Sequence, residues 1–238
     1  MKESCQKNHI SLPEEFSERM KIRLGQDWEA FLEACSMPPK RGLRLNLQKV
    51  DAHPDFPLKD WKENWKLEEL IKESTREYLC DEEYLQSIGV QIGHDAYHEA
   101  GLYYIQDPSA MSVVPYMELR PFDRCLDLCA SPGGKSLQIA DRLKTEEGGI
   151  LLSNEFIMER AKNLSKNVER MGYSHVAVSS CSAEELEAQF PAFFSRILVD
   201  APCSGEGMFR KNPEAIADWS LEKVSQCAGL QRDILGHA

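Results

Sequence analysis

Residues 124–143 read RCLDLCASPGGKSLQIADRL: a short apolar run, a glycine-rich loop and then an amphipathic stretch with helical spacing. Three more apolar runs follow, GGILLSNE (148–155), HVAVSS (175–180) and RILVD (196–200), with helical sequence between the runs. Strands that alternate with helices predict a parallel α/β sheet, and the ligand site of such a sheet lies beyond the carboxyl ends of its strands.

The loop after the first run, CASPGGKS, ends like a phosphate-binding P-loop but lacks the P-loop spacing. The position five residues before Gly134 is Cys129, where a P-loop requires glycine, and a full G-x-G-x-x-G fingerprint is also absent. Gly133 and Gly134 still let the backbone approach a carboxylate or a phosphate closely at the start of a helix. Glu155 ends the second run, where an acid can accept both hydroxyls of a ribose. A ribose and a carboxylate without a triphosphate describe S-adenosylmethionine.

The first hundred residues have a different style, polar and largely helical. LPEEFSERMKIRLG (12–25) and QDWEAFLEACS (26–36) predict amphipathic helices. Their apolar stripe fits a core face better than a binding surface, and it comprises Trp28, Phe31, Leu32 and Cys35. We expect a smaller, mainly helical or α+β N-terminal domain over residues 1–100 and an α/β core over 101–238.

The charge of the chain is unevenly distributed. The net charge is −11, but residues 51–100 hold thirteen acidic against five basic side chains. Within that segment, residues 51–85 predict an acidic helical insertion with a solvated face, which carries Trp61 and Trp65. The preceding stretch PPKRGLRLNLQK (38–49) contains no acid, and its Lys40, Arg41 and Arg44 fit a polyanion-binding footprint and a solvated loop equally well.

Several classes of protein are disfavoured by composition. No apolar run approaches the ~18 to 20 residues of a membrane span, and the N-terminus MKESCQKNHI has no apolar signal-peptide region. The eight cysteines form no C-x-x-C pair, which speaks against a zinc site or a disulfide framework. His94 and His98 lack a third ligand in view. We expect a soluble cytoplasmic protein with reduced thiols, without a metal and without a membrane partner.

Four motifs together carry a family resemblance: YYIQDPSAMSVV (103–114), DLCASPGGKS (127–136), NEF (154–156) and DAPCSGEGMFRK (200–211). In this order on alternating strands they resemble the NOP/SUN family of RNA cytosine-5 methyltransferases, in its bacterial ribosomal RNA branch. The resemblance implies a Rossmann-like core that uses S-adenosylmethionine to methylate carbon 5 of a cytosine in RNA, most of all ribosomal RNA. It also makes RNA the partner of Lys40, Arg41 and Arg44.

The same resemblance implies roles for individual residues. The loop holds the methionine end of the cofactor, Glu155 takes the ribose, and Asp200 lies between cofactor and base with Lys135 as an electrostatic helper. The family's acid after the third strand falls at Ser182, a departure that leaves the adenine contact to Glu184 or to a backbone group. The implied cofactor residues are Cys129, Ala130, Ser131, Pro132, Gly133, Gly134, Lys135, Glu155, Ser182 and Asp200.

Cys203 has three interpretations: assisting thiol, nucleophile or inert core side chain. The family it resembles takes its nucleophile from a Thr-Cys pair after the next strand and uses the Pro-Cys thiol for product release, so we predict the assisting role. The 238 residues contain no Thr-Cys pair, and we expect the sheet to be truncated and the nucleophile to lie beyond Ala238. The alternative function is a non-catalytic fragment that binds cofactor or RNA, and a P-loop hydrolase is a distant third.

Overall fold

The computed structural model describes residues 11–37, 40–52, 58–70 and 77–238, so the N-terminal decapeptide with Cys5 lies outside the described residues. The chain forms two compact units. The helical unit combines residues 11–37 with 202–233, and the two-sheet unit contains residues 40–201 together with 234–238.

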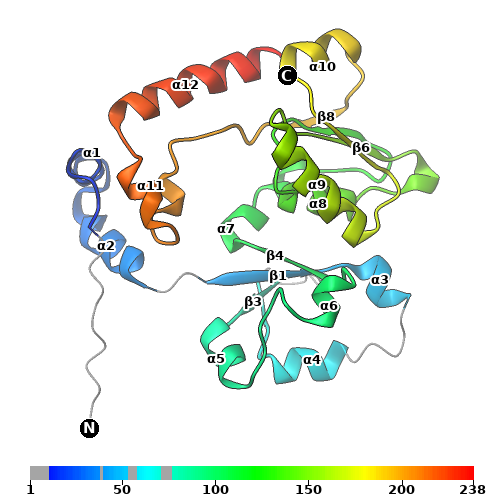
Figure 1. Ribbon diagram of the computed structural model, residues 1–238, viewed down its shortest axis with the longest axis horizontal. Helices are drawn as coiled ribbons and strands as arrows, with labels where there is room; N and C mark the ends of the chain where they lie inside the picture. Colours follow the sequence, from blue (N-terminus) through cyan, green and yellow to red (C-terminus); the bar gives the residue numbers. More distant parts are fainter. Residues whose placement is uncertain (1–10, 38–39, 53–57, 71–76) are drawn as a thin grey trace. The chain divides into compact units, whose positions relative to one another are not determined.

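The two-sheet unit contains the predicted parallel sheet. All four predicted runs are strands of one sheet, of which Figure 1 labels β6 and β8. The strand order is β7-β6-β5-β8, and every neighbouring pair is parallel. The strands are β5 (Arg124–Asp127), β6 (Ile150–Asn154), β7 (Val176–Ser179) and β8 (Arg196–Leu198). Within the described chain β8 pairs only with β5, so its outer edge carries no strand.

Helices cover both faces of this sheet because successive side chains of a strand point to opposite faces. Cys125 and Leu151 pack with α8 and α9, whereas Leu126 and Leu128 pack with α10. The helices that accompany the sheet are α8 (Gly134–Ala140), α9 (Met158–Met171) and α10 (Ala183–Gln189), with the 3₁₀ turns η2 (Val114–Met117) and η3 (Thr145–Glu147). The predicted apolar stripe of α9 is buried, and the helix ends where Gly172 takes a left-handed conformation.

A second sheet, which is antiparallel, precedes the first in the chain. Its order is β2-β3-β1-β4, and its strands are β1 (Arg41–Leu45), β2 (Glu68–Glu69), β3 (Glu77–Cys80) and β4 (Tyr103–Gln106). Short helices connect them: α3 (Leu47–Asp51), α4 (Leu58–Asn64), α5 (Glu82–Ser87), α6 (Ala96–Glu99) and α7 (Pro108–Met111). One face of the sheet packs on a cluster that contains Trp61, Trp65 and Leu85.

Two expectations about the first hundred residues are wrong. Residues 51–85 are not a helical insertion, because β3 pairs directly with β1 and the indoles of Trp61 and Trp65 are buried in the core of this sheet. Residues 53–57 and 71–76 of that segment lie outside the described residues. The boundary at 100/101 is too early, since β4 at 103–106 pairs with β1. The N-terminal helices 14–36 form part of a separate compact unit.

The helical unit packs around aromatic side chains. Its elements are α1 (Glu14–Leu24), η1 (Gly25–Asp27), α2 (Trp28–Ser36), η4 (Glu206–Met208), α11 (Pro213–Ala217) and α12 (Leu221–Gly236), whose last residues belong to the other unit. The ring of Phe16 lies 5.1 Å from that of Phe209 and 5.7 Å from that of Trp219, measured between centroids. The predicted apolar stripe of α2 faces inward: Trp28 is buried, and Phe31 packs against the same aromatic cluster.

Candidate active site

The carboxyl ends of the parallel strands bring three sequence motifs to one edge of the sheet. The loop after β5 is tied to its neighbours by two backbone hydrogen bonds, from Leu128 N to Leu198 O at 3.0 Å and from Ala130 N to Asn154 O at 2.8 Å. Glu155 follows β6 directly, and Asp200 comes two residues after the end of β8. The edge therefore gathers the glycine loop and both acids, as the strand pattern predicts.

The glycine loop is held from the side of α9. Asn167 donates to Pro132 O at 2.9 Å, and Arg160 donates to Ser131 O at 3.3 Å, while the Ser131 hydroxyl donates back to Arg160 O at 3.2 Å. Gly133 has φ +113°, a conformation that side chains disfavour, and its N–H is bonded to Ala130 O. The loop is thus a fixed turn that leads into α8.

Glu155 is buried at the end of β6 and has two partners. Its Oε1 accepts from the backbone N–H of Ile157 at 3.0 Å, and its Oε2 lies 3.3 Å from Nη2 of Arg160. Arg160 was missed by the sequence argument, although its place five residues after the acid on an amphipathic helix was a usable signal. The pair orients the carboxylate in the position where a ribose acceptor is expected.

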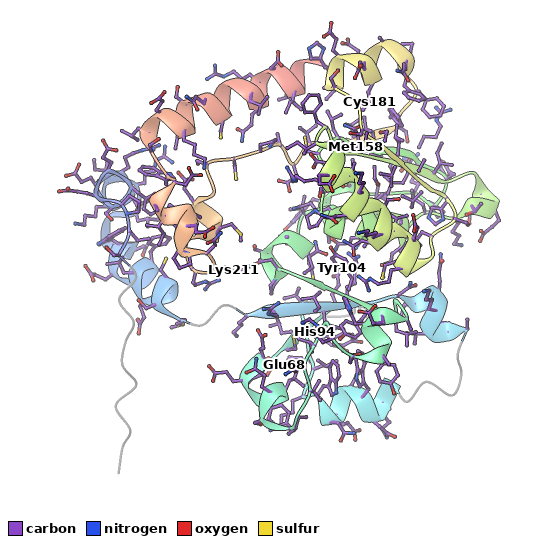
Figure 2. All side chains as sticks on the ribbon, in the orientation of Figure 1. Glu68, His94, Tyr104, Met158, Cys181 and Lys211 are labelled. Carbon is purple, nitrogen blue, oxygen red and sulfur yellow. The ribbon has the colours of Figure 1, made fainter. Side chains whose placement is uncertain are left out.

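Apolar side chains continue this part of the edge. Phe156 and Ile157 are exposed, and so is the next residue, Met158, which begins α9. Figure 2 labels Met158. Ser182, at the position of the family's adenine-side acid, is the N-cap of α10: its hydroxyl accepts from Glu185 N, and the Glu185 carboxylate accepts from Ser182 N. The Ser182 hydroxyl therefore already caps the helix, while the side chains beside Glu155 expose apolar surface.

Lys135 and Asp200 face each other across the edge. The Lys135 ammonium donates to Oδ2 of Asp200 at 2.6 Å, and the Asp200 carboxylate is 57 % exposed. This geometry brings together two of the three predicted catalytic residues, and it leaves the acid open to a ligand.

A third carboxylate, Asp127, lies below this pair at the end of β5 and was not singled out from the sequence. It is fully buried, and its Oδ2 accepts from the Ser136 hydroxyl at 2.6 Å. Burial raises the pKa of Asp127 to about 6, and the nearby charge of Asp200 adds to the rise, against the Ser136 hydrogen bond and Lys135. The signal that identifies it is a charged residue at the end of an otherwise apolar strand.

Two cysteines near this edge differ in exposure, since Cys129 is partly buried and Cys203 is exposed. Burial, with the charges of Asp127, Glu155 and Asp200, raises the pKa of Cys129 to about 11, so this thiol stays protonated at neutral pH. Cys203 is exposed and belongs to the helical unit, and its role stays a prediction.

The three basic residues predicted to bind RNA have different environments. Lys40 and Arg41 are exposed, and Arg41 is paired with Glu82 at 2.6 Å. Arg44 is only 1 % exposed and is bonded inside the two-sheet unit, so the prediction that it contacts RNA is wrong. A strand whose two faces are both covered buries its mid-strand charge, which a sequence pattern alone does not reveal.

Metal sites and membrane spans were the remaining expectations from composition. Among the described residues, His, Cys, Asp and Glu side chains form no group of three placed to hold a metal ion, and this includes His94 and His98. None of the described helices combines the length and apolarity of a membrane span.

Comparison with known proteins adds family information. Residues 114–238 match the family model of the 16S rRNA methyltransferase RsmB/F, and residues 12–108 match that of the N-terminal domain of 16S rRNA methyltransferase RsmF. The chain is 34 % identical to ribosomal RNA small subunit methyltransferase F of Enterobacter sp. (strain 638) over 235 residues. It is 35 % identical to the protein of the same name from Aliivibrio fischeri (strain ATCC 700601 / ES114) over 237 residues. Each alignment covers 97 % of this chain and 48 % of the relative, so the chain spans about half the length of these relatives.

Solved structures agree at the level of the fold. A methyltransferase homologue from Pyrococcus horikoshii superposes with a TM-score of 0.75 at 22 % identity, over 96 % of this chain and 69 % of that one. NSun6 from the same organism, solved with SFG, superposes with a TM-score of 0.74 at 16 % identity, over 96 % of this chain and 80 % of that one. The fold of this chain therefore has counterparts among solved structures.

Proposed function

We propose that this chain, which belongs to the RsmB/F family of 16S rRNA methyltransferases, binds S-adenosylmethionine at the carboxyl edge of its parallel sheet and serves methyl transfer to carbon 5 of a cytosine in RNA. One observation carries the proposal: the glycine loop, Glu155 and the Lys135–Asp200 pair lie together at this edge. Ribosomal RNA is the proposed substrate class, because it is the substrate in the names of the relatives.

The donor set fits this cofactor. Glu155 is an oriented acceptor for ribose hydroxyls, Lys135 is a cation for a carboxylate, and the exposed Phe156 offers an apolar face to a purine. Gly134 packs closely on Gln106, since a Cβ there would lie 3.0 Å from Cδ of the Gln106 side chain. When bound, S-adenosylmethionine supplies an electrophilic methyl group on a sulfonium.

The residues of this chain then have distinct tasks. Carbon 5 of cytosine is a poor nucleophile, so a thiolate must first add to carbon 6 of the base. In this proposal Asp200, which is exposed and paired with Lys135, binds the polar edge of the pyrimidine during that addition. Because the sequence contains no Thr-Cys pair, we assign the attack to no thiol of these 238 residues. Cys203 keeps the task of assisting loss of the carbon-5 proton and release of the thiol.

The target base must leave its stack to reach such a site. We propose that Lys40 and Arg41, which are exposed at the start of β1, contribute phosphate contacts to the RNA. Lys40 and Arg41 are the part of the predicted footprint that solvent can reach.

Titration calorimetry with S-adenosylmethionine and with ATP tests the proposal. We expect binding of S-adenosylmethionine and at least tenfold weaker binding of ATP, because the loop lacks the P-loop spacing. Equal or tighter binding of ATP would overturn the cofactor assignment. Because we assign the attacking thiol to none of these residues, we expect the chain to bind S-adenosylmethionine and to transfer no radiolabelled methyl group to ribosomal RNA, and transfer that is lost in Cys203→Ala would make Cys203 the nucleophile.

A further inference from the structure

Strand β1 has one apolar and one polar face, and both are buried. Leu43 and Leu45 point into the cluster of Trp61 and Trp65, whereas Arg44 between them points the other way. Arg44 lies opposite Glu77 of β3 and Tyr104 of β4 in the strand register. Tyr104 belongs to the core cluster of α8 and α9, so the polar face of β1 looks toward these helices (Figure 2).

The Arg44 guanidinium contacts both ends of helix α8. Its Nη1 donates to the carbonyl of Gly134, the first residue of the helix, at 3.0 Å, and its Nε lies 3.3 Å from Oδ2 of Asp141, the residue that follows the helix. The Gly134 carbonyl points toward the C-terminus of the helix, and the Asp141 side chain leans toward its N-terminus. The two groups therefore approach each other across the two helical turns that separate them, so that one guanidinium reaches both. Gln106 of β4 accepts from the same Nη1 at 3.2 Å, and the guanidinium carbon lies 5.9 Å from the centre of the Tyr104 ring.

The Gly134 carbonyl belongs to the same planar peptide unit as the N–H of Lys135. A hydrogen bond that fixes the direction of the carbonyl therefore fixes the N–H in the opposite direction, together with the start of the Lys135 side chain. The loop also rests on Gln106, as the close approach at Gly134 shows. Arg44 and Gln106 thus both contact Gly134, the residue before Lys135, whose ammonium binds Asp200.

We infer that Arg44 is a positioning residue for the cofactor loop, through which the antiparallel sheet sets the direction of the Gly134–Lys135 peptide and of the Lys135 ammonium. The inference rests on the proposed function, because it takes this loop to hold the methionine end of S-adenosylmethionine. A guanidinium fits this task because its planar fork serves several acceptors at once, which a lysine ammonium on a flexible stem does poorly.

The test compares two ligands on the same variants. S-adenosylmethionine carries the methionine carboxylate and ammonium, whereas methylthioadenosine keeps the adenosine and lacks both groups. Loss of positioning lowers the affinity for S-adenosylmethionine only, whereas a general loss of structure lowers the affinity for both ligands. Titration calorimetry on the wild-type chain, Arg44→Lys and the double variant Arg44→Met/Asp141→Asn measures this ratio. The double variant avoids leaving the Asp141 carboxylate without its cation in a buried site.

We expect the double variant to bind S-adenosylmethionine about tenfold more weakly, the effect of removing one hydrogen bond at the loop, and methylthioadenosine less than twofold more weakly. Arg44→Lys keeps a cation that can make one of these interactions, so its affinity for S-adenosylmethionine should lie between those of the double variant and the wild type. The matched control is Lys144→Met, which removes an exposed ion pair with Glu147 and changes neither affinity. A parallel fall of both ligands, or an unchanged S-adenosylmethionine affinity in the folded double variant, would overturn the inference.

Amide hydrogen exchange separates this inference from the proposed function. Without ligand, the amides of residues 135–137 should exchange faster in Arg44→Lys than in wild type, while those of α10 stay unchanged. If the wild-type chain binds no S-adenosylmethionine, the proposed function fails, and the exchange result still decides whether Arg44 orders the loop. If the double variant does not fold, Arg44→Lys alone decides, with a several-fold loss for S-adenosylmethionine against none for methylthioadenosine.

Discussion

The two sheets of the two-sheet unit differ in where their polar side chains lie and in how exposed these side chains are. In the parallel sheet, the acids Asp127, Glu155 and Asp200 lie at or just after the end of a strand, and Asp200 reaches solvent at the carboxyl edge. In the antiparallel sheet, Arg44, Glu77 and Gln106 stand within strands and are all buried. The charge of Asp200, beyond the end of a strand, is thus open to a ligand, whereas the charge of Arg44, inside a strand covered on both faces, joins structural elements.

The largest effect is expected from a substitution in the hydrophobic core of the antiparallel sheet. Trp61→Ala should lower the free energy of unfolding by about 3–5 kcal/mol, because the indole is buried against Trp65 and Tyr103 and leaves a cavity. Urea denaturation measures the loss. Tyr116→Ala, at a highly exposed aromatic side chain, is the control and should change it by less than about 0.5 kcal/mol. Equal losses would mean that this sheet has no core of its own.

The buried end of the parallel sheet gives the next largest effect. The folded-state pKa of Asp127, about 6, lies above the unfolded value of about 3.9, so its ionisation destabilises the fold. The cost is absent below pH 4, grows as the pH rises to 6, and reaches about 3 kcal/mol above that.

Asp127→Asn, which keeps an acceptor for Ser136, should therefore gain stability relative to wild type between pH 4 and pH 7. Urea unfolding at four pH values measures the difference. A stability difference between the two proteins that is constant with pH would show that Asp127 does not titrate in this range.

The third prediction concerns the carboxyl edge of the parallel sheet, where Glu155→Gln tests the proposed ribose acceptor. The substitution keeps the shape and removes the charge that accepts ribose hydroxyls, so affinity for S-adenosylmethionine should fall about 10- to 100-fold. Calorimetry measures it, with Glu159→Gln on the solvent side of α9 as the control. An affinity within twofold of wild type would remove Glu155 from the site.

The smallest effect is expected from the exposed start of β1. The double variant Lys40→Ala/Arg41→Ala should lower the slope of log affinity against log salt for a ribosomal RNA fragment by about 0.7–0.9 for each phosphate that the variant no longer neutralises. A salt series measures the slope, and Lys144→Ala, which removes an exposed cation paired with Glu147, is the control. An unchanged slope would leave this stretch as a solvated loop.

The parallel sheet and its edge were predictable because their signals are local. Each strand is a short apolar run, and each functional residue directly follows one, so Glu155, Asp200 and the loop could be placed from sequence order alone. The family match supports the NOP/SUN resemblance that the same motifs carry.

The antiparallel sheet was not predictable in this way. Its strands have two to five residues, and β1 pairs with partners more than thirty residues away along the chain. Trp61 and Trp65 lie in a charged segment, and nothing local shows that their faces meet. Arg44 was misjudged for the same reason, because its partners Gly134 and Asp141 come about ninety residues later.

The hydrogen bonds of Asn46 have a consequence for protein synthesis. Its side-chain amide donates to Met171 O, at the end of α9 and 125 residues further along the chain, and to Gly101 O. Lys49 donates likewise to Arg170 O and Ala100 O. At a translation rate of about 5–20 residues per second, these groups wait roughly 6–25 s for their partners to leave the ribosome. During that interval the nascent N-terminal sheet carries unpaired polar groups and an uncovered face, which is the window in which a chaperone would meet it.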